Sequence, residues 1–416
     1  MTEIYGTFGP SCGARPVLEA MLAEGLTGMR LNLSHTSLRE SISRIDNYRA
    51  ACAAMGRPAE LMIDMHGPQQ RTGWMKKPLR LKADENVILR ARGTTDIFPV
   101  VKVSPAVLGA LEAGDCITFH DQGVQVTVVR ELEPVCPDVS EGTSASEETT
   151  EGMMQETISS GEDGAEEILQ AEISCAGCGM TGMPYAETSS AGDETADMLQ
   201  TEKLPVADDK DRYRRFLCQV IRGDVVRSQQ TIRIEGKEVY GDVVHRMDEE
   251  NLDLAKDYGV TSVMQPFVRS GEDIREVREA LRVRGLDSLR IFAKIETLEG
   301  VANLDSIIRE ADVIVIARGD LGNAMPLWEL PRVQKEIAAK CRAAGRPFLT
   351  VTQMLDSMTH RPTPTRAEVS DIFNAVLDGS SAVMVTGETA VGEYPAQVIR
   401  YLARTVKEAE EYRCRL

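Results

Sequence analysis

Two apolar runs, Leu289-Arg-Ile-Phe-Ala-Lys294 and Asp312-Val-Ile-Val-Ile-Ala317, decide the fold of this 416-residue chain. Between them, residues 301–309 carry apolar side chains at the spacing of an amphipathic helix. A strand, a helix and a second strand in this order predict a right-handed βαβ unit, in which the two strands are parallel. The rest of the chain repeats this unit.

The alternation of short β-rich runs and helical stretches occurs eight times, in two blocks that a long interruption separates. The expected strands are residues 4–8, 28–33, 60–64, 262–268, 289–294, 312–317, 347–352 and 382–386. The expected helices include residues 16–24, 38–55, 271–283, 301–309, 330–344 and 367–377. Eight such units predict a closed α/β barrel, the (β/α)8 TIM barrel, formed by residues 1–73 and 245–416.

The interruption, residues 74–244, has a different pattern. Short β-rich pieces occur at residues 79–82, 86–89, 116–119, 124–129, 216–220 and 231–234, with turn residues between them. This pattern predicts a small β-rich domain that is inserted into a loop of the barrel.

The formal net charge of −18 is concentrated in one segment. Residues 137–200 contain 15 Asp or Glu and no Lys or Arg, so only −3 remains for the rest of the chain. An acidic segment rich in Ser, Thr and Gly cannot bury enough apolar surface to become ordered. We therefore expect residues 137–205 to be a flexible, disordered insert within the β-rich domain. The nearly neutral remainder disfavours a nucleic-acid partner.

The composition also predicts the compartment. No run of 18 apolar residues and no basic, apolar leader is present, so we expect neither a membrane span nor secretion, and a cytoplasmic protein. Nine cysteines without a secretory signal are expected to be free thiols. Cys175 and Cys178 form a close pair in the acidic segment, but a structural zinc would need two further ligands. An incidental pair is the favoured interpretation.

Polar side chains follow six of the eight expected strands at their carboxyl ends. They are Arg30, Asn32 and Ser34, Asp64 and Arg71, Lys294 and Glu296, Asp320, Thr352 and Gln353, and Thr386 and Glu388. Because the carboxyl ends of barrel strands meet at one face, where active sites lie, we expect these groups to converge.

Lys294, Glu296 and Asp320 have the chemistry of a cation site beside a fixed positive charge. Mg²⁺ prefers oxygen ligands and usually takes one or two protein carboxylates. A lysine beside it can stabilise a migrating phosphoryl group or a developing enolate. Two simpler interpretations stay open here: Lys294 and Glu296 could be an alternating solvated pair, and Asn32 and Ser34 could cap a following helix.

The motifs along the barrel resemble those of the pyruvate kinase family. They are Thr7-Phe-Gly-Pro10, Arg30-Leu-Asn-Leu-Ser-His35, Gly67-Pro-Gln-Gln-Arg-Thr-Gly73, Lys294-Ile-Glu296, Ala317-Arg-Gly-Asp-Leu-Gly322, Thr352-Gln-Met-Leu355, Pro364-Thr-Arg-Ala-Glu368, Asn374-Ala-Val-Leu-Asp-Gly379 and Gly387-Glu-Thr-Ala390. The resemblance is strong over residues 1–73 and 245–410 and weak in the inserted domain. It implies phosphoryl transfer from phosphoenolpyruvate to ADP, giving pyruvate and ATP, the last step of glycolysis.

The resemblance also implies a role for each matching residue. Glu296 and Asp320 would hold Mg²⁺ or Mn²⁺, and Lys294 would stabilise the phosphoryl group. Gly319, Asp320 and Thr352 would bind the substrate carboxylate, and Thr352 would help to deliver a proton. The K⁺ site would consist of Asn32, Ser34, Asp64 and the carbonyl of Met65. Arg30 and Arg71 would bind phosphates, and the nucleotide side would consist of Thr7, Pro10 and His35.

The chain departs from the family pattern mainly around the nucleotide and the K⁺ site. Met65-His66-Gly67-Pro68-Gln69 stands where the family usually has Thr-Lys-Gly-Pro-Glu, and Gln69 replaces the acid that accompanies potassium dependence. A K⁺ requirement is therefore left open. Ser228-Gln-Gln-Thr-Ile-Arg233 replaces an expected Lys-Gly-Val-Asn stretch, and Val391 replaces a lysine. These changes predict weaker binding of ADP or an altered phosphoryl acceptor.

The sequence ends at Leu416, where the family normally continues with a further α/β domain that carries effector sites and part of the tetramer contact. We expect no response to sugar-phosphate effectors, and a homodimer rather than a tetramer. Two other functions stay open. One is a catalytically impaired relative with a regulatory or scaffolding role, and the other is a Mg²⁺-dependent lyase that passes through a pyruvate enolate.

Overall fold

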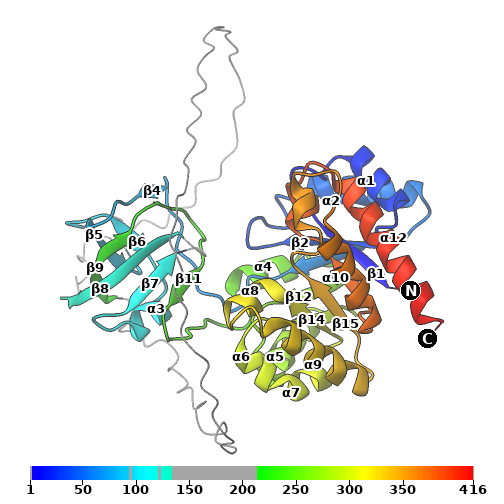
Figure 1. The fold of residues 1–416 in the computed structure, drawn as a ribbon. Helices are drawn as coiled ribbons and strands as arrows, with labels where there is room; N and C mark the ends of the chain where they lie inside the picture. Colours follow the sequence, from blue (N-terminus) through cyan, green and yellow to red (C-terminus); the bar gives the residue numbers. More distant parts are fainter. Residues whose placement is uncertain (1, 93–95, 120–122, 134–212, 416) are drawn as a thin grey trace, which may run out of the picture. The chain divides into compact units, whose positions relative to one another are not determined.

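A computed structural model describes residues 2–92, 96–119, 123–133 and 213–415. The expected acidic insert, residues 137–205, lies outside the described residues, as do Cys175 and Cys178. Within the described chain, eight parallel strands form a closed barrel in the order β1-β16-β15-β14-β13-β12-β3-β2, with helices around it (Figure 1). The predicted TIM barrel is confirmed.

The barrel strands begin and end within a few residues of the predicted positions. They are β1 (Glu3–Thr7), β2 (Gly28–Asn32), β3 (Glu60–Asp64), β12 (Ser262–Gln265), β13 (Arg290–Ile295), β14 (Val313–Ala317), β15 (Phe348–Val351) and β16 (Ala382–Met384). Alternate side chains face inward, so Tyr5, Met264 and Phe292 fill the barrel, while Val263 and Ile291 pack against the helices. This alternation follows from the two-residue period of a strand.

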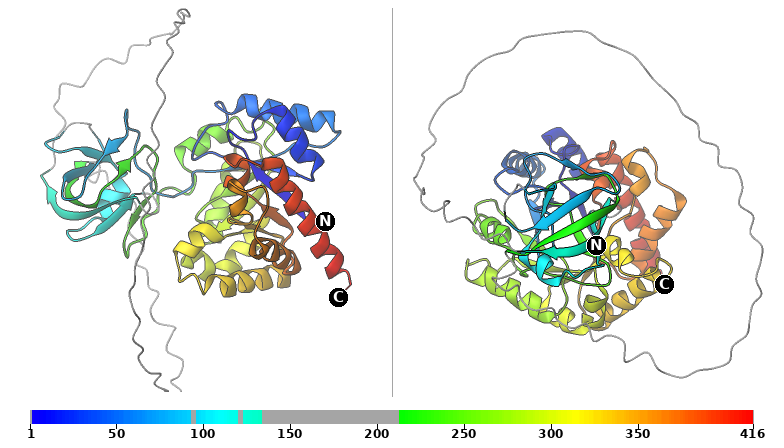
Figure 2. Two further views of the ribbon diagram at one scale, coloured as in Figure 1. Left: turned by 45° about the horizontal axis from the view of Figure 1, so that its top comes forward. Right: turned by 90° about the vertical axis from the view of Figure 1, so that its left-hand side faces the viewer.

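The helices cover the outside of the strands (Figure 2). They are α1 (Arg15–Ala23), α2 (Ile42–Ala54), α4 (Arg246–Leu252), α5 (Gly271–Arg282), α6 (Leu298–Ala302), α7 (Leu304–Glu310), α8 (Arg318–Asn323), α9 (Leu330–Ala343), the 3₁₀ helix η3 (Asp356–Thr359), α10 (Arg366–Leu377), α11 (Gly387–Ala390) and α12 (Pro395–Arg413). The backbone amide of Thr2 donates to Glu410 on α12, so the two ends of the described chain lie side by side. No helix among the described residues is both long and apolar enough to span a membrane.

The prediction of a single helix at residues 301–309 is wrong. Two short helices, α6 and α7, meet at Asn303 instead. The backbone of Asn303 leaves the helical region, with φ −93° and ψ 11°. Its side-chain amide donates to the carbonyl of Arg269 at 2.9 Å. This contact joins the boundary between the two helices to the chain just before α5.

The chain between β3 and α4 forms two further sheets. A six-stranded sheet has the order β11-β7-β8-β9-β5-β6, and a two-stranded sheet pairs β10 with β4. The elements are β4 (Leu79–Arg80), β5 (Asn86–Arg90), β6 (Val100–Lys102), α3 (Pro105–Ala110), β7 (Cys116–Phe119), β8 (Val124–Leu132), β9 (Arg215–Arg222), β10 (Val225–Val226) and β11 (Ile232–Ile234). Val87, Val126 and Phe216 belong to a hydrophobic cluster that is separate from the barrel core. The predicted β-rich character is confirmed, although β6, β10 and α3 were not anticipated.

Candidate active site

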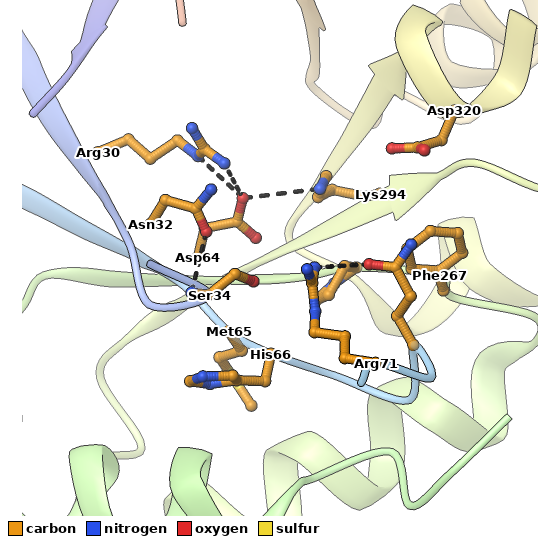
Figure 3. Close-up of a pocket in the computed structure, with 12 residues that line it drawn as sticks. Arg30, Asn32, Ser34, Asp64, Met65, His66, Arg71, Phe267, Lys294 and Asp320 are labelled. Atoms are coloured by element: carbon orange, nitrogen blue, oxygen red, sulfur yellow. Dashed lines mark hydrogen bonds and ion pairs between the residues drawn. The ribbon is translucent and has the colours of Figure 1, made fainter. Parts of the chain in front are cut away.

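A polar pocket of about 150 Å³ opens at the carboxyl ends of the barrel strands (Figure 3). Eight of the predicted site residues line it, namely Arg30, Asn32, Ser34, Asp64, Met65, Arg71, Lys294 and Asp320. The other lining residues are His66, Gln69, Pro266 and Phe267. Strands far apart in sequence bring these side chains together, as the barrel topology requires.

Lys294 lies at the centre of the charged groups. Its ammonium nitrogen is 2.8 Å from Glu296 Oε1 and 3.6 Å from Asp64 Oδ2, and the side chain is only 14% exposed. Burial alone would lower the pKa of Lys294, but the negative charges of Asp64 and Glu296 outweigh it and raise the pKa. Lys294 therefore carries its positive charge at neutral pH, and the interpretation as a solvated surface pair is wrong.

Glu296 is a carboxylate held in a dry environment. Its Oε2 accepts a hydrogen bond from the backbone amide of Phe267 at 2.8 Å, and the residue is 2% exposed. Burial raises the pKa of Glu296 to about 7, and the nearby charge of Asp320 adds to this effect although Lys294 opposes it. Asp320 lies in the first turn of α8, which begins where β14 ends.

Phe267 has an unusual backbone that serves this contact. Its φ of 50° lies in the left-handed region, which bulky residues rarely adopt. This turn directs the Phe267 amide to Glu296. The sequence carried no signal for this role, because Phe267 was expected inside the fourth strand, whereas β12 ends at Gln265.

Asp64 is buried beneath Arg30. The guanidinium donates to Asp64 Oδ2 through two nitrogens, with Arg30 Nε at 2.9 Å. Burial would raise the pKa of Asp64, but the charges of Lys294 and Arg30 reverse this and lower it. The other oxygen, Asp64 Oδ1, is buried without a hydrogen-bond partner. An ionised oxygen left in this condition is suited to a cation.

Asn32 and Ser34 lie beside Asp64 and do not cap a helix. The Ser34 amide donates to Asn32 Oδ1 at 3.2 Å, whereas the next helix, α2, has Ser41 at its N-cap position. The capping interpretation is therefore wrong. Both residues line the pocket with Met65, as a K⁺ site would require.

Arg71 reaches into the pocket from the chain after β3. It donates to Gln69 Oε1 at 2.6 Å and to the carbonyl of Gln229 at 3.2 Å. Thr7 is buried behind Arg30, which donates to Thr7 Oγ1 at 3.3 Å. Six predicted residues do not line the pocket, namely Glu296, Thr7, Gly319, Thr352, Pro10 and His35. Of these, Pro10 and His35 are exposed.

Thr352 and Gly319 lie against each other at the ends of β15 and β14. Both Thr352 and the next residue, Gln353, have positive φ, at 76° and 54°. A Cβ added to Gly319 would lie 3.0 Å from Thr352 Cγ2, so only glycine fits without movement of the threonine. Arg318 donates to the carbonyl of Thr352 at 2.6 Å, a contact that the sequence interpretation missed although Arg318 lies inside the motif at 317–322.

His66 and Asp248 are a second pair that sequence reasoning missed. Asp248 Oδ1 accepts from the backbone amide of His66 at 2.7 Å and lies 3.0 Å from His66 Nδ1. Asp248 Oδ2 accepts from the Gly67 amide at 3.0 Å. These bonds hold the loop that carries Met65. Only the departure from the family pattern at His66 marked this position in the sequence.

The positions that depart from the family pattern carry no added positive charge in the structure. Val391 is 59% exposed directly after α11. Ser228 binds the chain near Met75, since the Met75 amide donates to its hydroxyl at 2.9 Å. Neither side chain can replace an ammonium group.

The donor set fits the cations that the resemblance implies. Asp320 lies close enough to Glu296 for its charge to raise the pKa of Glu296. Two carboxylates at this separation suit Mg²⁺. The unpartnered Asp64 Oδ1, next to Asn32 and Ser34, suits a monovalent cation.

Comparisons with known proteins agree with this geometry. The family model described as "Pyruvate kinase, barrel domain" matches residues 1–143 and 201–399. A pyruvate kinase of Leishmania mexicana is 30% identical over 415 residues, covering 98% of this chain and 67% of the relative. Pyruvate kinase 2 of Trypanosoma brucei brucei is 32% identical over 408 residues, covering 98% and 67%.

Other relatives are longer than this chain. A pyruvate kinase of Bacillus licheniformis is 29% identical over 414 residues. This alignment covers 99% of this chain and 57% of that relative. A crystal structure of a pyruvate kinase from Cryptosporidium parvum matches with a TM-score of 0.68 and 26% identity, covering 99% of this chain and 69% of that one. The barrel, the pocket and these matches together place the chain in the pyruvate kinase family.

Proposed function

We propose that this chain transfers the phosphoryl group of phosphoenolpyruvate to ADP and releases pyruvate and ATP, as in the last step of glycolysis in the cytoplasm. The observation that carries this proposal is Lys294, a buried ammonium group 2.8 Å from Glu296 and 3.6 Å from Asp64. The chain spans between 57% and 67% of the length of the relatives named above.

Lys294 would stabilise the phosphoryl group during transfer. The group carries negative charge on its oxygens in the transition state, and a fixed ammonium in a site that excludes water stabilises that charge strongly. Arg30 would bind the same phosphate, and its contact with Asp64 keeps the guanidinium in place before substrate arrives. The arrangement is set before binding, which reduces the reorganisation that the reaction requires.

Thr352 and Gly319 would bind the carboxylate of the substrate. The two residues are in close contact at neighbouring strand ends, and Asp320 follows Gly319 in α8. Thr352 would also help to deliver a proton to the methylene carbon of the enolate, through water, after the phosphoryl group has left. The proton converts the enolate to pyruvate.

Glu296 and Asp320 would hold Mg²⁺ or Mn²⁺, and Asn32, Ser34, Asp64 and the carbonyl of Met65 would hold K⁺. The family generally uses both Mg²⁺ and K⁺. Bound Mg²⁺ would supply positive charge to the oxygens of the substrate. The need for K⁺ stays open, because Gln69 gives Arg71 a neutral partner in place of an acid.

The nucleotide would lie on the side of Arg71. Arg71 would bind its phosphates, and Thr7, Pro10 and His35 would lie towards it. We further propose that residues 1–73 and 245–416 form the catalytic barrel domain, and that residues 74–244 act as a lid domain. A homodimer is the proposed assembly.

A second candidate is a catalytically impaired relative with a regulatory role. It is favoured by one specific observation, namely that Val391 and Ser228 leave two positions without the positive charges expected near the nucleotide phosphates.

A coupled assay for pyruvate separates the candidates. Phosphoenolpyruvate and ADP are supplied with Mg²⁺, with and without K⁺, and Lys294→Met is compared with the wild type. We expect the wild type to form pyruvate and Lys294→Met to lose at least a hundredfold in kcat, because the transition-state charge loses its buried partner.

Lys340→Met is the matched control, since Lys340 is 47% exposed and its ammonium lies 2.9 Å from Asp305, on the outer helices of the barrel. Its activity should equal that of the wild type. A wild type that forms no pyruvate, or a Lys294→Met variant that keeps full activity, would overturn the proposed function. Formation of pyruvate and inorganic phosphate without ADP would instead show hydrolysis, with water as the phosphoryl acceptor.

A further inference from the structure

The chain after β15 has a backbone that must be held in place. Thr352 and Gln353 both lie in the left-handed region, with φ of 76° and 54°. A β-branched residue is a genuine outlier there, because its side chain collides with its own backbone. Such strain costs free energy and persists only where the surroundings enforce it.

Arg318 makes the contacts that enforce this conformation. Its Nη2 donates to the carbonyl of Thr352 at 2.6 Å, and its Nε lies 3.2 Å from the same oxygen. Nε also lies 3.3 Å from the carbonyl of Val351, and Nη2 lies 3.0 Å from Met354 Sδ. Hydrogen bonds from a charged donor are about twice as strong as neutral ones. One guanidinium therefore binds the backbone carbonyls of Val351 and Thr352 and the side-chain sulfur of Met354.

Asp371 fixes the guanidinium in turn. Asp371 lies on α10 and accepts from Arg318 Nη1 at 2.6 Å, and the arginine side chain is 10% exposed. A planar guanidinium presents its donors in a rigid fork, so one anchored edge orients the other. Lysine could not bridge Asp371 and two carbonyls in this way.

Arg318 also connects both parts of the proposed carboxylate site. Arg318 directly precedes Gly319. A Cβ added to Gly319 would lie only 3.0 Å from Thr352 Cγ2, so the two residues are closely packed. A shift of the Thr352 carbonyl would therefore move the threonine relative to Gly319. Hydrogen bonds from Arg318 therefore connect Asp371, on α10, to the backbone of Thr352.

We propose that Arg318, oriented by Asp371, is a positioning residue that holds Thr352 in its left-handed conformation and so places the threonine hydroxyl against the substrate. This inference rests on the proposed function, because it assigns a purpose to the geometry of Thr352 in that reaction. Arg318 itself touches no reacting atom; it acts through Thr352.

The test uses the full chain with Asp371→Asn, which keeps the shape of the side chain, and with Arg318→Lys. We expect kcat for pyruvate formation to fall about tenfold or more in both variants, since release of Thr352 removes an aligned contact. We also expect the exchange of pyruvate methyl protons with deuterated water, followed by NMR, to fall at least as much, because that reaction transfers a proton without transferring a phosphoryl group. The KM for ADP should change by less than twofold.

Asp305→Asn is the matched control, because Asp305 is 66% exposed and its partner is Lys340 on the outer helices. It should retain wild-type kcat and proton exchange. Thermal unfolding of each variant shows whether the chain has folded.

A rescue experiment separates positioning from general destabilisation. Gln353→Gly relieves the strain at the second left-handed residue, because glycine adopts positive φ without cost. Added to Asp371→Asn, it should restore at least a third of the lost kcat. If Asp371→Asn keeps wild-type kcat and proton exchange while Lys294→Met is inactive, this inference fails and the proposed function stands. If Gln353→Gly restores stability but no activity, the inference also fails. An inactive wild type would instead overturn the proposed function.

Discussion

At the scale of single residues, the charged groups around Lys294 match the family pattern, whereas the positions on the nucleotide side depart from it. Lys294, Glu296 and Asp64 are buried and in contact, with ion-pair distances of 2.8 Å and 3.6 Å. Around the nucleotide side, neutral residues take positions where the family has charged ones. Because buried charges interact far more strongly than exposed ones, the first group should control the chemistry and the second the affinity for ADP.

Val391→Lys is expected to strengthen the binding of ADP. Val391 is 59% exposed directly after α11, where the family resemblance places a lysine near the nucleotide phosphates. One partly screened ammonium should lower the KM for ADP about three- to tenfold at low salt, and less at high salt. Steady-state kinetics with varied ADP at two ionic strengths measures this.

Val283→Lys provides the comparison, because Val283 is 61% exposed at the end of α5, away from the strand ends that form the pocket. It should leave the KM for ADP unchanged. Equal effects of the two lysines would show that net charge alone is responsible, and the predicted role of position 391 would be wrong.

At the scale of elements, periodicity predicted most of the barrel. All eight strands occur where short apolar runs alternate with helical stretches, because burial on both faces requires continuous apolar sequence. The short helix α8 and the strained backbones of Phe267 and Thr352 were not predicted. Their conformations depend on contacts from elements distant in sequence, such as the contact of Arg318 on α8 with Thr352, and no local pattern records such contacts.

The same limit applies to the candidate site. The polar residues at the strand ends could be placed from the barrel topology alone, and seven of them do line one pocket. The helix-capping alternative for Asn32 failed because α2 begins ten residues later, at Ile42. The role of Asp248 could not be foreseen, since it binds a loop about 180 residues earlier in the chain.

The start of α4 is the element that holds the loop of Met65, and this predicts a stability effect. Asp248 is fully buried and accepts from the amides of His66 and Gly67 at 2.7 Å and 3.0 Å. It also completes the capping box of α4 with His245. Asp248→Ala leaves these buried donors unpaired, at about 1–3 kcal/mol each. We expect the free energy of unfolding to fall by about 3 kcal/mol in chemical denaturation.

Asp253→Ala is the control for this change, because Asp253 lies at the other end of the same helix with its side chain 64% exposed. Its free energy of unfolding should stay within about 0.5 kcal/mol of the wild type. A loss for Asp248→Ala no larger than this would contradict the structural role of the buried carboxylate.

At the scale of the whole molecule, the buried carboxylate of Glu296 links the stability of the protein to pH. Burial raises the pKa of Glu296 from 4.5 to about 7 in the folded chain. A group with a raised pKa binds its proton more tightly when folded, so the stabilising effect is complete below pH 4.5 and is lost as pH rises through 7. Above pH 7 the carboxylate is ionised and available to a metal.

Mg²⁺ should therefore stabilise the whole chain more at pH 8 than at pH 5.5. At the lower pH, binding must displace the proton of Glu296, whereas at the higher pH the proton has already left. A ligand that binds only the folded state raises the midpoint of thermal unfolding, and it does so more when it binds more tightly. Scanning calorimetry with and without Mg²⁺ at both values of pH measures the difference. In Glu296→Gln, which cannot ionise, the Mg²⁺-induced shift should be small and independent of pH. An equal shift at pH 5.5 and pH 8 in the wild type would show that Glu296 is not the ligand whose ionisation controls Mg²⁺ binding.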